Sequence, residues 1–306
     1  MIFICSAEND ITTNEVVKNL RLNNKAFYRF NLESDYITGL NLTDNNVTIE
    51  VNNKTIIKNP SFFWYRRGKI KFGREMNIFS EDNRSILDFL YKKTSPNFLN
   101  EFKDNFINKL KVLEIAKNNE LRIPKYMITS SKKELLKFIG EVGDCCTKPL
   151  DVLPQFDFEN ESYEVFTNKI SSSTVKSIPE KFQSSLIQEY IDKKFEIRTF
   201  YLNKKMFSIA IFSQTNVKTS IDFRQYDRET PNRCVPFKLP KSYEKKIISL
   251  FKDLELNSGS LDIIYSTKNE FVFLEVNPIG QFMQVSLPGN YDLEIELAKF
   301  ISKYER

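Results

Sequence analysis

Apolar residues along this chain recur with two different periods, and the alternation between them predicts where strands and helices lie. Short apolar runs typical of strands occupy residues 2–6, 26–31 and 61–67. After the first run, Thr12 and Glu15 have the spacing of a capping box, so a helix is predicted to about residue 23. Residues 41–57 alternate and turn at asparagines, which indicates hairpins. Helical stretches are then predicted over residues 85–91 and 98–107.

A second unit is predicted to begin near residue 108, where apolar positions return at helix spacing. Ser131 and Glu134 form a second capping pair, which predicts a helix over residues 133–142. Strands are predicted over residues 122–129, 144–150 and 185–191. The polar, serine-rich segment 155–180 is expected to form a hairpin or a flap.

The last third is rich in strands. Two hairpins are predicted, one turning at Asn203 and Lys204 and the other at residues 267–269. An amphipathic helix lies between them at residues 241–256, and a final helix covers about 291–303.

The composition describes an ordinary soluble globular protein. The 306 residues are 41% hydrophobic and 28% charged. No apolar run has the length of a membrane span, and the N-terminus lacks the basic and apolar regions of a signal peptide, so the cytoplasm is the expected compartment and no membrane partner is expected. The net charge of +5 is mild and evenly spread, so no nucleic-acid partner is expected.

The count of zero histidines restricts the chemistry most strongly. It removes histidine acid–base catalysis, histidine-activated nucleophiles and histidine-ligated metals. The four cysteines form no C-x-x-C pair, so they are expected to be reduced and not to bind zinc. Any metal is expected to have oxygen ligands, which favours Mg²⁺, Mn²⁺ or Ca²⁺. The common glycine-rich phosphate loops are also absent from the sequence.

One apolar strand, FVFLEVNPIGQF over residues 271–282, is interrupted by a carboxylate and an amide. Glu275 and Asn277 point to the same side because side chains alternate along a strand. If this strand pairs with residues 260–266, Asp262 lies opposite Glu275 or within one residue of it. These three side chains would then offer oxygen ligands to a hard cation. The alternative is an exposed polar face of an edge hairpin.

Other charged residues are ambiguous when taken singly. Lys148 and Lys109 are compatible with anion contacts, but solvated lysines are common in any protein. Glu196 and Arg198 share one face of a predicted strand, where a cross-strand ion pair is the alternative to a functional role.

Taken in order, these pieces resemble the ATP-grasp superfamily over residues 105–300. The series is Lys109, Lys148-Pro, Q-E-Y-I at 188–191, E-I-R at 196–198, Asp262 and E-V-N-P at 275–278. The resemblance implies an α/β (α+β) fold with three parts: an N-terminal pre-ATP-grasp domain over 1–107, a central subdomain over 108–187 and a C-terminal subdomain over 188–306.

The resemblance also implies roles for these residues. Lys148 and either Lys109 or the nearby Lys111 would contact the ATP phosphates, and Glu196 would bind the ribose. The adenine would be lined by Gln188, Glu189, Tyr190 and Ile191. Two Mg²⁺ ions would be held by Asp262, Glu275 and Asn277. Residues 155–175 contain no glycine, unlike the flap over the triphosphate in many ATP-grasp proteins.

Further motifs are similar to those of graspetide (microviridin-type) synthetases, closest to the peptide maturases of grasp-with-SPASM clusters. They are D-x-x-T-x-x-V at 10–16, W-Y-R-R at 64–67, I-x-S-Q at 211–214, D-F-R at 222–224 and E-V-N-P-x-G-Q at 275–281. Such an enzyme activates a carboxylate of a precursor peptide as an acyl phosphate and closes an ester or amide ring.

In that reaction Arg198 would contact the γ-phosphate or the acyl phosphate. Arg224 would hold the acceptor carboxylate, and Asp222 would take a proton from the nucleophile or orient Arg224. Residues 213–238 would recognise the leader and core of the precursor, although an ordinary charged loop is the alternative. Family members are often homodimers, so a homodimer is expected.

Two other functions stay open at this point. One is a RimK-like ATP-grasp ligase that adds amino acids to a protein tail or to a small molecule. The other is a nucleotide-binding scaffold that has lost catalysis, against which the presence of all three metal-ligand candidates and both lysines argues.

Overall fold

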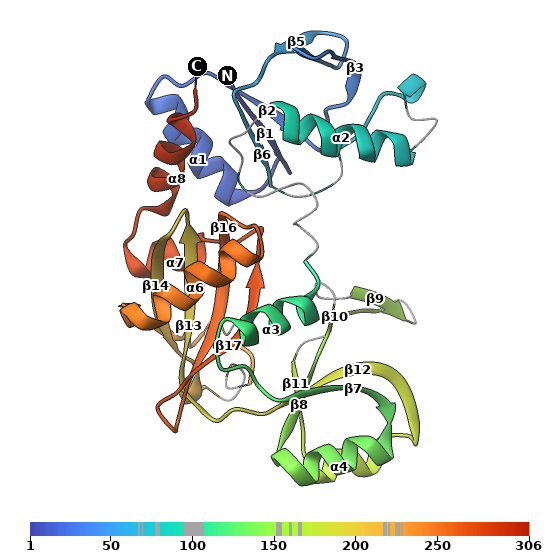
Figure 1. Cartoon of the computed structure of the whole chain (residues 1–306), viewed down its shortest axis with the longest axis vertical. Coiled ribbons are helices and arrows are strands. Elements are labelled where there is room, and N and C mark those ends of the chain that lie inside the picture. Colours follow the sequence, from blue (N-terminus) through green and yellow to red (C-terminus); the bar gives the residue numbers. More distant parts are fainter. Residues whose placement is uncertain are drawn as a thin grey trace.

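The computed structural model contains three parts that follow one another along the chain (Figure 1). It describes residues 1–66, 68, 70–76, 80–94, 99, 107–150, 155–158, 161–164, 167–216, 219, 221–223, 227 and 229–305. An N-terminal α/β part lies at the top of Figure 1, a five-stranded sheet with its helices lies in the middle, and a small sheet with helix α4 lies at the bottom.

The N-terminal part is built on a parallel sheet of order β2-β1-β6, in which β1 and β6 are buried along their length and β2 is mostly half-buried. Its elements are β1 (Ile2–Ser6), α1 (Ile11–Leu22), β2 (Phe27–Asn31) and β6 (Phe62–Tyr65). The predicted capping box at Thr12 and Glu15 is wrong. Asp10 caps α1 instead, because its Oδ1 accepts a hydrogen bond from the Thr13 backbone N–H at 2.8 Å.

The N-terminal part also contains a separate three-stranded antiparallel sheet. It consists of β3 (Ile37–Leu42), β4 (Val47–Val51) and β5 (Thr55–Lys58), which confirms the predicted hairpins. Alternate residues of β4 pack into a core that also contains residues of α2 (Ser80–Thr94). The predicted helix over 98–107 falls almost entirely outside the described residues.

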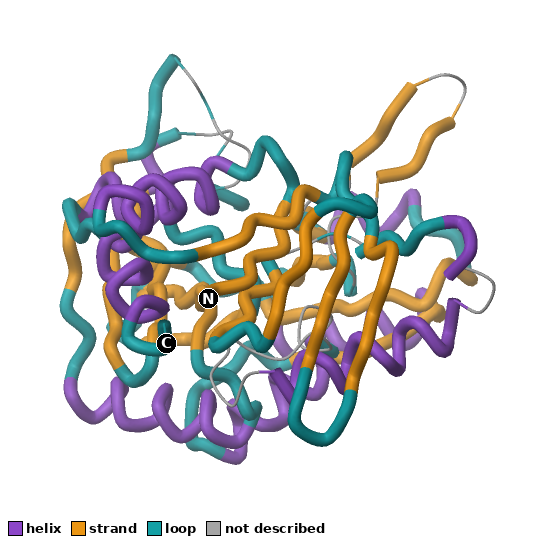
Figure 2. Tube along the Cα trace, turned by 90° about the horizontal axis from the view of Figure 1, so that it is seen from above, coloured by secondary structure: helices purple, strands orange, loops and turns teal. Residues whose placement is uncertain are grey.

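The central part is an antiparallel sheet of order β11-β8-β12-β7. Its strands are β7 (Tyr126–Ser131), β8 (Cys145–Lys148), β11 (Asn168–Ile170) and β12 (Lys181–Glu189). One face packs its apolar residues against α4 (Lys132–Val142) and α5 (Ser172–Ser177). The predicted hairpin is present as β9 (Gln155–Phe158) and β10 (Glu161–Glu164), which extend away from the body of the protein (Figures 1 and 2).

The C-terminal part is an antiparallel sheet of order β15-β14-β13-β16-β17. Its strands are β13 (Lys193–Leu202), β14 (Lys205–Phe212), β15 (Arg233–Phe237), β16 (Ser258–Ser266) and β17 (Phe271–Asn277). The turn at Asn203 and Lys204 is as predicted, and both residues have positive φ, which suits a tight hairpin. The second hairpin also turns where the sequence predicts, between Ser266 and Phe271.

The two faces of β13 explain how this sheet positions a site. Ile197 and Tyr201 pack with α6 (Lys241–Asp253) and α3 (Lys109–Asn118) in one apolar core. On the opposite face, Phe200 packs into a second core while Glu196 and Arg198, closer to the start of the strand, are charged. The same face of β13 is therefore charged near the start of the strand and apolar further along it.

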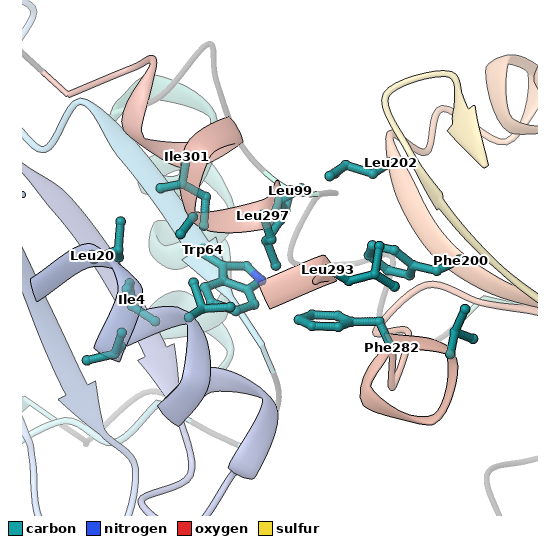
Figure 3. Close-up of a cluster of buried hydrophobic side chains, with 14 of the residues drawn as sticks. Ile4, Leu20, Trp64, Leu99, Phe200, Leu202, Phe282, Leu293, Leu297 and Ile301 are labelled. Atoms are coloured by element: carbon teal, nitrogen blue, oxygen red, sulfur yellow. The ribbon is translucent and has the colours of Figure 1, made fainter. Parts of the chain in front are cut away.

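The second core joins the N-terminal and C-terminal parts (Figure 3). Ile4, Leu20 and Trp64 lie on one side of it and Phe200 and Phe282 on the other. Residues of α8 (Leu293–Ser302) lie between them, so the two ends of the chain meet on the same side of the molecule (Figures 1 and 2). This shared core fixes the N-terminal part against the sheet that carries the site.

Several elements differ from the sequence prediction. Strand β7 begins at Tyr126, after the proline at 124, because proline supplies no backbone N–H to a sheet. Helix α7 (Met283–Gly289) and strand β15 were not predicted. Helix α7 contains Pro288, and a proline in a sequence argues against a helix at that position. Ser131 occupies the predicted cap of α4, but its side chain makes no capping hydrogen bond.

None of the helices in the described ranges combines the length and the apolar character that crossing a membrane requires.

Candidate active site

A cavity between the central sheet and the C-terminal sheet gathers most of the charged residues singled out in the sequence. Its volume is about 70 Å³ and it is open to solvent, so in this structure it is smaller than the about 300–1,000 Å³ of most small-molecule and cofactor sites. The predicted residues that line it are Lys148, Gln188, Glu189, Tyr190, Ile191, Glu196, Asp222, Asp262 and Glu275.

Asp262 and Glu275 are direct partners across β16 and β17, as the sequence predicted. A β-bulge follows immediately, because Ile263 pairs with Phe273 and Leu274 is the extra residue. Both carboxylates line the cavity. The bulge occurs at the site itself, where it turns the side chain of Glu275 relative to the rest of its strand.

Each carboxylate has a cationic partner. Arg198 Nη1 donates to Asp262 Oδ1 at 3.1 Å and to Oδ2 at 3.3 Å, across the pair β13 and β16. Lys148 Nζ donates to Glu275 Oε2 at 3.2 Å, and this contact connects the central sheet with the C-terminal sheet. The cross-strand ion pair considered for Arg198 is therefore real, but it is formed with Asp262, and Arg198 is 6% exposed. Lys148, Asp262 and Glu275 line the cavity, whereas Arg198 holds Asp262 without lining the cavity itself.

Asn277 lies two residues further along the same face, opposite Ser260, and is exposed; it does not line the cavity. Its Oδ1 accepts a hydrogen bond from the Gly280 backbone N–H at 3.3 Å. Within the described residues no group of three or more His, Cys, Asp or Glu side chains has metal-binding geometry. The candidate donor set thus consists of two carboxylates and one amide, which leaves coordination positions for oxygens of a nucleotide and for water.

The Q-E-Y-I segment forms another wall of the cavity at the end of β12. Gln188 is only 2% exposed, and Glu189 accepts from the Lys125 N–H at 3.2 Å and contacts the Arg122 guanidinium. The ammonium of Lys169 lies 4.3 Å from the centroid of the Tyr190 ring. Burial raises the pKa of the Tyr190 hydroxyl, so this hydroxyl is neutral at ordinary pH.

Glu196 faces the cavity and forms a buried ion pair that the sequence analysis missed. Lys193 Nζ donates to Glu196 Oε1 and, at 3.0 Å, to the backbone carbonyl of Ile221. Burial raises the pKa of Glu196 above its usual value, and the nearby Lys193 ammonium opposes that rise. The i,i+3 spacing of Lys193 and Glu196 was visible in the sequence, but on a strand only a bulge lets such residues meet, and β13 is irregular between Lys193 and Phe195.

Replacing Lys193 with methionine tests this pair through pH. The carboxyl of Glu196 would lose its cation, so its folded-state pKa would rise further above the unfolded value. The variant should then be closest to wild-type stability at acidic pH, where Glu196 is protonated, and should lose stability as pH rises through the folded pKa. At neutral pH we expect a loss of about 3–5 kcal/mol, measured by urea unfolding.

Two controls separate this effect from lost packing. The double variant Lys193→Met/Glu196→Gln should lose the additional pH dependence, because no titrating carboxyl remains. Lys205→Met removes an exposed partner of Glu296 and should change stability by less than about 1 kcal/mol. An equal loss for Lys193→Met at acidic and neutral pH would contradict the assignment.

The remaining predicted residues are placed less centrally. Lys109 Nζ donates to the Pro149 carbonyl at 3.0 Å, beside Lys148, but does not line the cavity. Lys111 lies exposed on the same helix. Asp222 is buried and lines the cavity, whereas Arg224 lies outside the described residues, as do Lys218 and Arg228.

Phe223 and Cys146 also line the cavity and were not predicted. The Arg198 guanidinium lies 5.8 Å from the centroid of the Phe223 ring, so Phe223 helps to fix the arginine. Burial raises the pKa of the Cys146 thiol, which makes it an inert wall residue. Phe223 belongs to the D-F-R motif, whereas a cysteine two positions before Lys148 carries no sequence signal of its own.

Comparison with known sequences gives little. No family model matches the chain. A transposase for insertion sequence element IS1151 from Clostridium perfringens is 26% identical over 218 residues. The match covers 70% of this chain, and the chain spans only 38% of the transposase. A match this distant and partial carries no functional argument.

Comparison with solved structures covers the whole chain. A RiPP-associated ATP-grasp ligase from Chryseobacterium gregarium, in complex with ADP and a leader and core peptide, has a TM-score of 0.82 at 21% identity over 99% of this chain and 96% of its own. The macrocyclase MdnC from Microcystis aeruginosa, bound to precursor peptide MdnA, has a TM-score of 0.80 at 21% identity over 99% of both chains. D-alanyl-alanine synthetase A from Vibrio cholerae has a TM-score of 0.61 at 13% identity over 99% of this chain and 97% of its own.

All three identities are below a quarter, so the likeness establishes the fold and leaves the reaction to be argued from the site. The chain therefore has the fold of the ATP-grasp ligases over its full length, and the α/β ATP-grasp fold that its sequence motifs implied is confirmed.

Proposed function

We propose that this chain is an ATP-dependent ligase that macrocyclises a ribosomally made precursor peptide through side-chain ester or amide bonds. The observation that carries the proposal is a pair of ion pairs whose carboxylates line one cavity, Lys148 with Glu275 and Arg198 with Asp262. The likeness in fold to two enzymes crystallised with precursor peptides supports the choice of a peptide as the substrate.

The donor set fits Mg²⁺. Asp262 and Glu275 supply carboxylate oxygens on neighbouring strands, and Asn277 supplies an amide oxygen on the same face. We propose that these three residues hold two Mg²⁺ ions together with ATP phosphate oxygens. When bound, the ions would neutralise charge on the phosphates during transfer.

The residues of the chain then have distinct tasks. The wall of residues 188–191 would receive the adenine, and Glu196, held by Lys193, would accept hydrogen bonds from the ribose hydroxyls. Lys148 would exchange its carboxylate partner for a phosphate oxygen, and Lys109 beside it would support the same anion. These groups provide positioning and charge, which is what phosphoryl transfer requires from a protein without histidine.

The proposed reaction proceeds in two steps. A carboxylate oxygen of the peptide attacks the γ-phosphorus of ATP, the bond to the ADP oxygen breaks, and an acyl phosphate forms. A lysine amine or a serine or threonine hydroxyl of the same peptide then attacks the acyl carbon, and inorganic phosphate leaves. Arg198 would stabilise the transferring phosphoryl group, Arg224 would hold the acceptor carboxylate, and Asp222 would take the proton of the nucleophile or orient Arg224.

Mass spectrometry of a precursor peptide incubated with the enzyme, ATP and Mg²⁺ tests the proposal. Each ring should lower the peptide mass by one water and release one ADP and one phosphate. A gain of amino-acid residue masses on a peptide tail or small molecule would instead show a RimK-like ligase. Neither change, with intact nucleotide binding, would show a scaffold without catalysis.

We further propose that the enzyme works in the cytoplasm as a homodimer. All four cysteines are free thiols, which suits a reducing compartment. Light scattering on the purified protein would measure its mass and test the dimer directly.

A further inference from the structure

One buried arginine connects the N-terminal part to the chain that follows the candidate metal ligands. Arg66 follows β6 and is 2% exposed, although arginine is rarely buried without partners. It belongs to the W-Y-R-R stretch, for which neither the sequence nor the proposed reaction gives a task. Its neighbour Arg67 lies outside the described residues.

Arg66 contacts residues of both the N-terminal part and the C-terminal part. Its Nη1 donates to the carbonyl of Gly280 at 3.0 Å and to the carbonyl of Ile279. Its Nε lies 3.7 Å from Oδ2 of Asp10, the residue that caps α1. Asp10 thus caps α1 with one carboxylate oxygen and directs the other toward the Arg66 guanidinium.

Gly280, whose carbonyl accepts the hydrogen bond from Arg66, is closely surrounded by other atoms. Its φ is +53°, and a Cβ placed there would lie 3.1 Å from the Ser260 backbone nitrogen. Its own N–H is shared between the backbone carbonyl of Asn277 at 3.1 Å and Oδ1 of Asn277 at 3.3 Å. Arg66 therefore holds the carbonyl of the same residue whose N–H holds the Asn277 carboxamide.

We infer that Asp10 and Arg66 are positioning residues that orient the Asn277 carboxamide for metal binding, an inference that rests on the proposed function. An amide oxygen has two lone pairs, so the Gly280 N–H occupies one and leaves the other for a cation. Groups that orient a metal ligand from behind commonly change metal affinity by about 10–100-fold when removed. The N-terminal part thereby contributes to a site to which it supplies no ligand.

Metal binding, measured apart from turnover, tests the inference. Manganese is titrated into enzyme saturated with ADP, and free Mn²⁺ is followed by its electron paramagnetic resonance signal. Arg66→Ala should weaken Mn²⁺ binding by about 10–100-fold while ADP binding without metal stays within about twofold of wild type. Arg66→Lys should show a smaller weakening, because an ammonium replaces the fork of the guanidinium.

Arg29→Ala is the matched control. Arg29 also donates to two backbone carbonyls, those of Ala7 and Glu8, but both lie within the N-terminal part. It should lower thermal stability without changing Mn²⁺ affinity. A double variant, Arg66→Ala/Asn277→Ala, should bind Mn²⁺ as weakly as Asn277→Ala alone, since Arg66 acts through Asn277.

The outcomes are distinguishable. Equal Mn²⁺ affinity in Arg66→Ala and Arg29→Ala, or additive losses in the double variant, would overturn the inference and leave the proposed function standing. A wild-type protein that binds neither ADP nor Mn²⁺ would overturn both. If Arg66→Ala does not fold, Arg66→Lys against Arg29→Lys makes the same comparison.

Discussion

Replacing Glu275 with glutamine is expected to abolish measurable ligation, with a loss of about 10³-fold or more in turnover. Glutamine has nearly the same shape, so the strand and its bulge should be retained. The change removes one of the two carboxylates proposed to hold the metal ions and breaks the ion pair with Lys148. Loss of one charge-stabilising contact in a water-poor site typically costs about 10²–10³-fold, and a metal ligand should cost at least as much.

The measurement is ADP release together with the mass of the precursor peptide, with thermal unfolding as a check on the fold. Glu270→Gln is the matched control, because Glu270 is an exposed carboxylate just before the same strand and pairs with Arg122. It should keep turnover within about threefold of wild type, as exposed ion pairs contribute little. Full activity of Glu275→Gln would refute the assignment of Glu275 as a metal ligand.

The register that brings Asp262 opposite Glu275 could be predicted from the sequence for a simple physical reason. Both strands alternate and the turn between them is short, so few registers keep the apolar residues on the buried face. A carboxylate that interrupts such a strand is then visible as an exception. Alternation likewise predicts that Glu196 and Arg198 share one face of β13, but not that Arg198 pairs with Asp262.

Contacts between distant segments could not be predicted in this way. Lys193 donates to the backbone carbonyl of Ile221, 28 residues away along the chain, and Arg66 donates to that of Gly280 in another part of the protein. No local pattern encodes these pairs, because they depend on how separate sheets pack. Helix α7 was missed for a related reason: its buried Val285 and Ser286 contribute to a tertiary packing that outweighs the unfavourable proline at 288.

Replacing Arg198 with lysine is expected to lower kcat by about 10²–10³-fold with little change in nucleotide affinity. The guanidinium of Arg198 is buried, donates to both oxygens of Asp262 and lies over the ring of Phe223. Lysine keeps the charge but loses the planar fork that can contact a carboxylate and a phosphoryl oxygen together. Alanine is the less informative change, because breaking the Arg198–Asp262 ion pair would also destabilise the fold, by up to about 3–5 kcal/mol.

The pattern of kinetic constants identifies what Arg198 does. A residue that contacts the phosphoryl group mainly in the transition state should lower kcat and kcat/KM equally, whereas a ground-state contact should raise KM alone. Single-turnover ADP formation separates the phosphoryl step from product release, and hydroxylamine trapping of the acyl phosphate shows whether that step still occurs. Arg29→Lys, which replaces a guanidinium outside the site, should leave all of these constants within about twofold. If Arg198→Lys forms ADP at the wild-type rate but closes no ring, Arg198 acts in the second step, and its assignment to the γ-phosphate is wrong.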